Sequence, residues 1–180
     1  MSDPYQRLEK REIYRNPWIA VEVHRIVHPT GAPGEHVAIG TGRASGVLVV
    51  DERSFLFARQ ARFAAGIEAI EIVKGGADEG ETALACAQRE LREELGIVAE
   101  RWTSLGITYE VPSIVGNAVS LFLAQEIRIG ATEPEAVEAI DAVRISIDDA
   151  YRACMDGRID DAVTLATLLR YQLLRDGTQS

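Results

Sequence analysis

Residues 75–97 read GGADEGETALACAQRELREELGI, a glycine-rich loop followed by a run that contains neither proline nor glycine until residue 96. Thr82 stands before this run and Gly96 ends it, and these residue types are favoured before the first turn and after the last turn of a helix. The sequence therefore predicts a loop followed by a helix over residues 82–95. The apolar side chains that recur at helical period, and that we expect to anchor the helix, are Leu84, Ala87, Leu91 and Leu95.

Three carboxylates share another face of the predicted helix, because Glu90, Glu93 and Glu94 are three and four positions apart. Carboxylates this close repel one another unless a cation lies between them. Oxygen ligands without clustered His or Cys favour Mg²⁺ or Mn²⁺ over zinc. The alternative is a solvated acidic face that the neighbouring arginines stabilise. The glycine-rich loop before the helix favours the metal site over this alternative, because its glycines allow a tight turn that brings backbone carbonyls and Glu81 close to the ion. We therefore expect the acidic face of the helix to be presented and not buried.

Length, charge and cysteine content narrow the function classes. A chain of 180 residues has room for one domain and an appendage. The formal net charge of −9 argues against nucleic acid or an anionic membrane as the main partner. We see no signal peptide pattern and no apolar run near the ~20 residues that span a bilayer. Only Cys86 and Cys154 are present, far apart, which favours a reducing cytoplasm and makes Cys86 a space-filling residue rather than a nucleophile.

Short apolar segments alternate with turn-forming residues along the rest of the chain. We expect strands at residues 18–28, 35–40, 46–50, 54–60, 69–73, 102–110, 118–125 and 140–145, and further helices at 148–155 and 162–175. Residues 126–138 are expected to be mostly loop. This order predicts an α/β or α+β sandwich. Residues 1–45 would form a small β extension of about two strands, and residues 46–180 the main domain.

Nine positions in residues 75–97 resemble the Nudix box: Gly75, Glu81, Arg89, Glu90, Leu91, Glu93, Glu94, Gly96 and Ile97. The flanks resemble the ADP-ribose pyrophosphatase branch of that superfamily, especially its ADP-compound hydrolases. The segments that carry this second resemblance are residues 16–18, 59–62, 71–75, 112–117 and 146–165. The resemblance implies a Nudix-type αβα sandwich with a mixed β-sheet, in which the box forms a loop and helix. Departures at Val73, Gly76 and Glu79 remove no ligand and bear on the substrate more than on the chemistry.

The resemblance also implies roles for individual residues. The candidates are Glu90, Glu94, Glu93 and the Lys74 carbonyl for metal; Glu93, Glu138, Arg89 and Glu81 for catalysis; and Arg62, Arg59 and Trp18 for substrate. Either Glu138 or Glu93 would be the general base. Arg62 is either a phosphate contact or a surface arginine at a strand end. Trp18 either stacks on adenine or belongs to the core.

The implied reaction is metal-dependent hydrolysis of the pyrophosphate bond of a nucleoside diphosphate linked to another moiety. ADP-ribose or a related ADP compound is favoured, giving AMP and a phosphorylated remainder, with Mg²⁺ (or Mn²⁺) activating water and neutralising phosphate charge. The alternatives are a Nudix hydrolase of dinucleoside polyphosphates, NADH or nucleotide sugars, and a non-catalytic sensor of ADP compounds. In the resembled branch the N-terminal extension pairs with a second subunit, so we expect a cytoplasmic homodimer that binds a small nucleotide and neither nucleic acid nor membrane.

Overall fold

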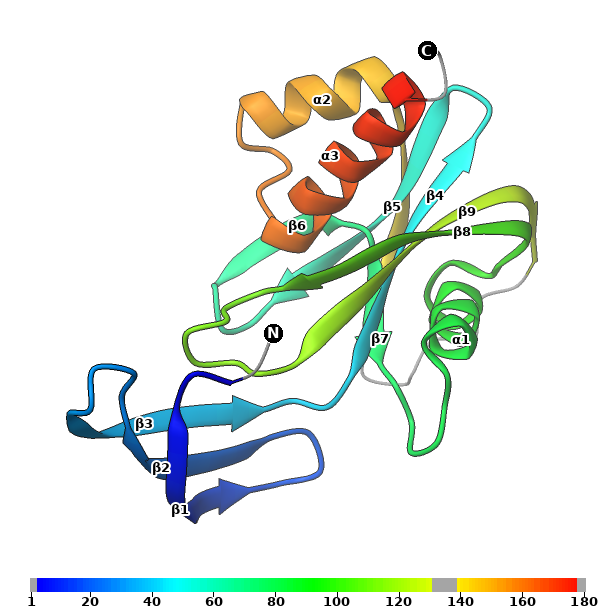
Figure 1. The fold of residues 1–180 in the computed structure, drawn as a ribbon. Helices are drawn as coiled ribbons and strands as arrows, with labels where there is room; N and C mark the ends of the chain where they lie inside the picture. Colours follow the sequence, from blue (N-terminus) through cyan, green and yellow to red (C-terminus); the bar gives the residue numbers. More distant parts are fainter. Residues whose placement is uncertain (1–2, 131–138, 178–180) are drawn as a thin grey trace. The chain divides into compact units, whose positions relative to one another are not determined.

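The computed structural model describes residues 3–130 and 139–177 of the chain (Figure 1). It divides into two compact units, each with its own β-sheet. The first unit comprises residues up to Arg43 together with Tyr109–Ala118, and the second comprises Ala44–Thr108 and the residues from Val119 onward. Among the described residues, no helix is long and apolar enough to cross a membrane.

The first unit contains a three-stranded antiparallel sheet in the order β1-β2-β3. Its strands are β1 (Gln6–Arg15), β2 (Ala20–Val27) and β3 (Pro33–Gly40). The expectation of about two strands was wrong, because β1 was missed. All ten residues of β1 are exposed. It is an edge strand that pairs through its backbone with β2, so its sequence shows no buried, apolar face.

The segment Tyr109–Ala118 also belongs to the first unit, where it contacts β3. The backbone N–H of Ile39 donates to the carbonyl of Ile114 at 2.8 Å. The Thr41 hydroxyl donates to Asn117 Oδ1 at 2.6 Å, across 76 positions of sequence. The sequence identified this stretch as a loop, but no local pattern predicts its pairing with β3.

The second unit contains a seven-stranded sheet whose main path runs β10-β5-β4-β9-β8. Its strands are β4 (Ala44–Asp51), β5 (Ser54–Arg62), β6 (Ile67–Glu71), β7 (Val73–Gly76), β8 (Ile97–Tyr109), β9 (Ala118–Ile129) and β10 (Asp141–Ser146). Strand β4 pairs parallel with β9 and antiparallel with β5, so the sheet is mixed.

Helices cover both faces of this sheet: α1 (Ala83–Leu95) lies on one face, and α2 (Ile147–Met155) and α3 (Ala162–Gly177) lie on the other (Figure 1). Alternate residues of β4 enter the two cores, since Leu48 packs in the α2/α3 core and Val49 in the α1 core. The predicted αβα sandwich with a mixed sheet is confirmed.

Several predicted strand boundaries were wrong. Strand β8 begins at Ile97 and not at residue 102. Strand β9 was expected to end at residue 125 but continues to Ile129, into the segment expected to be mostly loop, and it pairs with β8. Ion pairs join the two strands there, between Arg128 and Glu100 and between Arg101 and Glu126. Opposite charges on neighbouring strands stabilise an exposed stretch of sheet that has no apolar pattern of its own.

The expected strand at residues 69–73 is divided into two strands. Strand β6 pairs with β5, whereas β7 pairs with β4, and Ile72 between them pairs with neither. The chain therefore changes partner strands immediately before the glycine-rich loop.

Candidate functional site

Helix α1 begins and ends where its sequence predicted. The Thr82 hydroxyl accepts a hydrogen bond from the backbone N–H of Ala85 at 3.2 Å. Gly96 has a φ of 64°, in the left-handed region, and its N–H donates to the carbonyl of Arg92 at 2.9 Å. These contacts satisfy backbone groups that the helix itself leaves unpaired at its two ends.

The buried face of α1 differs from the predicted stripe. It consists of Cys86, Ala87, Leu91, Glu94 and Leu95. Leu84 is 38% exposed, so its assignment to the anchor was wrong. Because Cys86 and Glu94 are buried, the covered face extends toward the carboxylates and away from Leu84. Glu94 is only 6% exposed, so the expectation of a presented acidic face was also wrong for this residue.

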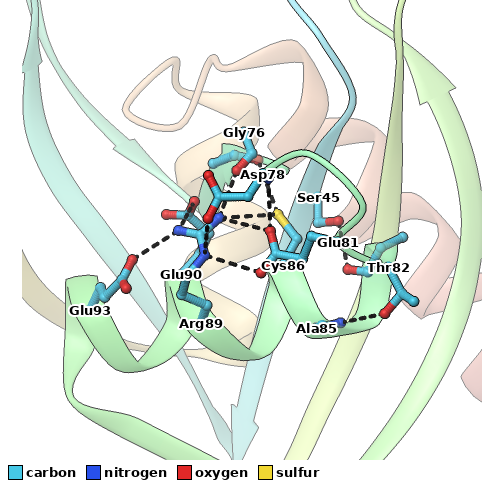
Figure 2. A network of polar contacts seen from close by, with 12 residues as sticks. Ser45, Gly76, Asp78, Glu81, Thr82, Ala85, Cys86, Arg89, Glu90 and Glu93 are labelled. Atoms are coloured by element: carbon cyan, nitrogen blue, oxygen red, sulfur yellow. Dashed lines mark hydrogen bonds and ion pairs between the residues drawn. The ribbon is translucent and has the colours of Figure 1, made fainter.

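Arg89 connects the carboxylates to the glycine-rich loop (Figure 2). Its Nε and Nη2 atoms donate to the two carboxylate oxygens of Glu81, each at 3.1 Å. Nη1 donates to Glu90 at 2.8 Å and to Glu93 at 2.9 Å, and Nη2 donates to the carbonyl of Gly76 at 2.7 Å. A planar guanidinium suits this arrangement, because it donates in several fixed directions at once.

The electrostatic consequences appear in the pKa values of the two partners. Hydrogen bonds to Glu81, followed by the charge of Glu90, raise the pKa of Arg89 against the effect of burial. Hydrogen bonds from Arg89 lower the pKa of Glu81, to which the N–H of Asp78 adds a further bond at 2.9 Å. Glu81 is therefore held ionised and fixes both the arginine and the loop before the helix.

Strand β7 forms the wall of the site. A Cβ atom on Gly75 would overlap the Glu90 carboxylate, so glycine is required for this close approach. The thiol of Cys86 donates to the carbonyl of Gly75 at 3.6 Å, and burial raises the pKa of that thiol. A buried thiol with a raised pKa is a poor nucleophile, which agrees with the predicted space-filling role of Cys86.

The donor atoms suit a hard divalent cation, since α1 carries three carboxylates and one of them, Glu90, lies against the β7 backbone. The Glu90 carboxylate fills the space left by Gly75, next to the backbone of the predicted ligand Lys74. In the described part of the chain, no three His, Cys, Asp or Glu side chains converge as a metal-ligand group. Arg89 binds oxygens of both Glu90 and Glu93 in this arrangement, so ligation would require those side chains to reorient.

A second ionic cluster lies beside β7 and was missed by the sequence analysis. Glu71 is 1% exposed and contacts two cations: Arg62 at 2.6 Å and Lys74 Nζ at 2.9 Å. Lys74 Nζ also contacts Asp161 Oδ1 at 2.7 Å. The available sequence signal was a lone glutamate in the apolar run at residues 69–73, but nothing local identifies Asp161 as a partner.

The predicted substrate residues are distributed over both units. Arg62 lies at the end of β5, and its side chain is 41% exposed. Arg59 contacts Asp141 of β10 at 2.9 Å. Trp18 follows β1 in the first unit and is 77% exposed, so it does not belong to the core of this chain. The predicted base Glu138 lies outside the described residues.

The sequence matches the NUDIX domain family over residues 40–168, and the nucleoside diphosphate sugar hydrolase N-terminal domain family over residues 5–36. An ADP-ribose pyrophosphatase of Bacillus subtilis (strain 168) is 26% identical over 176 residues, covering 96% of this chain and 95% of that protein. A crystal structure of an ADP compounds hydrolase has a TM-score of 0.86 at 19% identity, covering 97% of this chain and 95% of the other. That structure shares the fold.

Proposed function

The chain belongs to the Nudix family, and from this premise we propose that it hydrolyses the pyrophosphate bond of a nucleoside diphosphate linked to another moiety, with ADP-ribose or a related ADP compound as the favoured substrate. The products would be AMP and a phosphorylated remainder. The observation that carries the proposal is that α1 bears Glu90, Glu93 and Glu94 together, with the Glu90 carboxylate packed against Gly75. The 26% identical ADP-ribose pyrophosphatase supports the choice of substrate.

We assign Mg²⁺, or Mn²⁺ in its place, to the carboxylates Glu90, Glu93 and Glu94 and the carbonyl of Lys74. A bound divalent ion neutralises phosphate charge and lowers the pKa of a bound water. Arg89 orients Glu90 and Glu93 through its hydrogen bonds to both. Glu81 supports the loop by accepting from the N–H of Asp78.

We further propose that Arg62 contacts a substrate phosphate. Glu71 holds its guanidinium through Nε and Nη2, while the Arg62 side chain as a whole is 41% exposed at the end of β5. A fixed, partly exposed guanidinium can bind a phosphate with little loss of conformational entropy. Arg59 is the second candidate, although its contact with Asp141 leaves it fewer unused donors.

Trp18 is proposed as the residue that stacks on adenine. The side-chain oxygen of Asn16 accepts hydrogen bonds from the N–H groups of Trp18 and Ile19, at 2.9 and 2.8 Å, which fixes the turn that carries the indole. An indole that is both exposed and locally fixed offers a flat apolar surface to a base. The general base remains either Glu93 or Glu138.

The first unit supports the proposal of a homodimer. Its small sheet carries exposed apolar side chains at Leu8, Ile13, Tyr14 and Val37, and Trp18 between β1 and β2 is exposed as well. A sheet of this size gains stability when another surface covers it. The two cysteines form no disulfide, which supports the proposed cytoplasmic location.

The test is a substrate panel assayed with and without Mg²⁺. We expect metal-dependent release of AMP from ADP-ribose at a higher kcat/KM than from diadenosine polyphosphates or NADH. Hydrolysis of NADH or a diadenosine polyphosphate at a higher kcat/KM would replace the proposed substrate. Binding of ADP-ribose without turnover of any nucleotide would instead make the protein a sensor.

The second candidate is a hydrolase of another nucleoside diphosphate sugar. The match of residues 5–36 to the nucleoside diphosphate sugar hydrolase N-terminal domain family favours it, since that family name specifies no base. GDP-mannose therefore belongs in the same panel, with release of GMP as the readout. A preference for GDP-mannose over ADP-ribose would support this candidate.

A further inference from the structure

The change of strand partner at Ile72 is held by the first turn of α3. Strand β6 pairs with β5 as far as Glu71, and β7 pairs with β4 from Val73 onward. The backbone N–H of Ile72, between the two ladders, donates to the hydroxyl of Thr164 at 3.0 Å. Both residues are fully buried, so this hydrogen bond satisfies a donor that has no access to water.

A second link joins the same turn of α3 to Lys74. Lys74 Nζ donates to Asp161 Oδ1 at 2.7 Å. The other oxygen of Asp161 accepts from the backbone N–H of Thr164 at 2.8 Å and from its hydroxyl at 2.6 Å. Asp161 therefore caps α3 and binds Lys74 at the same time, so the helix start holds the chain on both sides of Val73.

The charges in this cluster stabilise one another. Burial alone would lower the pKa of Lys74, but the negative charges of Asp161 and Glu71 outweigh burial and raise it. Burial likewise would raise the pKa of Asp161, but the charge and hydrogen bond of Lys74 lower it. A buried, paired charge of this kind requires a defined geometry, so it restricts the positions that β7 can take.

The residues directly after Lys74 form the wall of the carboxylate site. Gly75 packs against Glu90, and the carbonyl of Gly76 accepts from Arg89 at 2.7 Å. Gly75 and Gly76 follow Lys74 in the same strand, which advances only about 3.3 Å per residue. A displacement of the backbone at Lys74 would therefore also displace Gly75 and Gly76.

We propose that the first turn of α3 positions the carboxylate site through β7, with Asp161, Thr164 and Lys74 as positioning residues. Helix α3 contributes no side chain to the group around Arg89, and it acts by fixing the backbone of residues 72–76. The expected effect of these residues on metal affinity rests on the proposed function, whereas their expected effect on the order of β7 is independent of it.

Thr164→Val and Thr167→Val provide a matched comparison. Both threonines are fully buried on α3, but the Thr167 hydroxyl donates only to the carbonyl of Val163 in its own helix, at 2.7 Å. Hydrogen exchange should show faster exchange of the amides of residues 72–76 in Thr164→Val and no change there in Thr167→Val. Titration with Mn²⁺ should show about tenfold weaker binding in Thr164→Val only, as expected when a group supporting a metal ligand is removed.

Thr164→Ser keeps the hydroxyl and should restore both the exchange rates and the Mn²⁺ affinity. The proposal is overturned if the two valine variants alter residues 72–76 equally, or if Thr164→Val leaves their exchange unchanged. A wild-type protein that neither binds Mn²⁺ nor hydrolyses any nucleotide would refute the proposed function. In that case the exchange rates of residues 72–76 still decide whether α3 positions β7.

Discussion

At the scale of single residues, Arg89 determines how the carboxylates are arranged. It donates to three glutamates and to one backbone carbonyl, and it joins the helix to the loop before it. Ionic hydrogen bonds are stronger than neutral ones, and the limited exposure of these side chains reduces screening by water. One arginine therefore neutralises part of the charge of these carboxylates and lets them lie close to one another.

Replacing Glu94 by Gln should nearly abolish turnover and leave the fold intact. Gln has almost the same shape as Glu, so the change removes a charge from a buried position while the apolar contacts of α1 remain. Steady-state kinetics and thermal unfolding measure the two effects. Glu100→Gln, an exposed change on β8, is the control. If Glu94→Gln kept more than about a tenth of wild-type activity, a barrier change under ~1.4 kcal/mol, the assignment of Glu94 would be wrong.

The raised pKa of Tyr151 predicts that the folded protein loses stability in alkaline solution. Burial raises the pKa of Tyr151 to about 12 from its usual value of 10.0, and its hydroxyl donates to the carbonyl of Leu168 at 3.3 Å. A raised pKa means that the folded state holds the proton more tightly. The stabilising effect is thus complete below pH ~10 and is lost as the pH rises through ~12.

Denaturant unfolding at a series of pH values from 9 to 12 tests this prediction. Tyr151→Phe should reduce the dependence of the unfolding free energy on pH in this range. Tyr109→Phe, at an exposed position on β8, serves as the control. Equal pH dependence in wild type and Tyr151→Phe would show that this tyrosine is not the group responsible.

At the scale of elements, the site depends on the contact of α1 with β7. The Glu90 carboxylate lies against Gly75, in the space that a side chain at this position would occupy. The next residue, Gly76, has open space around the position of a Cβ atom. Alanine at Gly75 would disturb the packing of Glu90, whereas alanine at Gly76 would meet no neighbouring atom. Comparing the two variants therefore distinguishes a loss of packing against Glu90 from the general effect of replacing a glycine.

Gly75→Ala should lower kcat/KM by about 10- to 100-fold, because the added methyl group displaces a proposed metal ligand. Gly76→Ala should retain most of the wild-type activity. Kinetic measurements on both variants, together with their unfolding temperatures, provide the comparison. Similar losses of activity in the two variants would show that the Glu90 contact does not control the site.

At the scale of the whole molecule, the two units differ in the covering of their sheets. The sheet of the second unit has helices on both faces, whereas β1 of the first unit is exposed along its length. Four charged residues separate Leu8 from Ile13 on β1, and charges on an exposed edge strand limit aggregation. A second copy of the chain is the proposed cover for this sheet.

Light scattering at micromolar concentration should show a dimer for the wild-type protein. Ile13→Lys should shift it toward monomer, because the change places a charge on the proposed interface. Val98→Lys, at an exposed position on β8, should not. A wild-type monomer would refute the dimer.

Trp18→Ala tests the proposed role of this unit in binding. It should raise KM for ADP-ribose more than it lowers kcat, since stacking on a base holds the substrate equally in its ground and transition states. A fall in kcat at unchanged KM would exclude a stacking role.

The sequence by itself determined the helix at residues 83–95, its two capping residues and the grouping of three glutamates. These features are local: the caps lie next to the helix, and the glutamates lie within about one turn of one another. The spacing of these residues also identified the family, and with it the αβα fold and the class of reaction. The apolar segments identified most strands of the second unit, although not the start of β8 or the end of β9, and they missed β1 of the first unit.

Only the tertiary structure decided which distant residues meet. The pairing of β3 with residues 114–117, the burial of Glu94 and the contact of Lys74 with Asp161 all follow from the path of the chain. Ile72 and Thr164, which meet in the core, are 92 positions apart. No local preference of either residue specifies such a pair, because their contact forms only when the sheet and helix α3 are packed together.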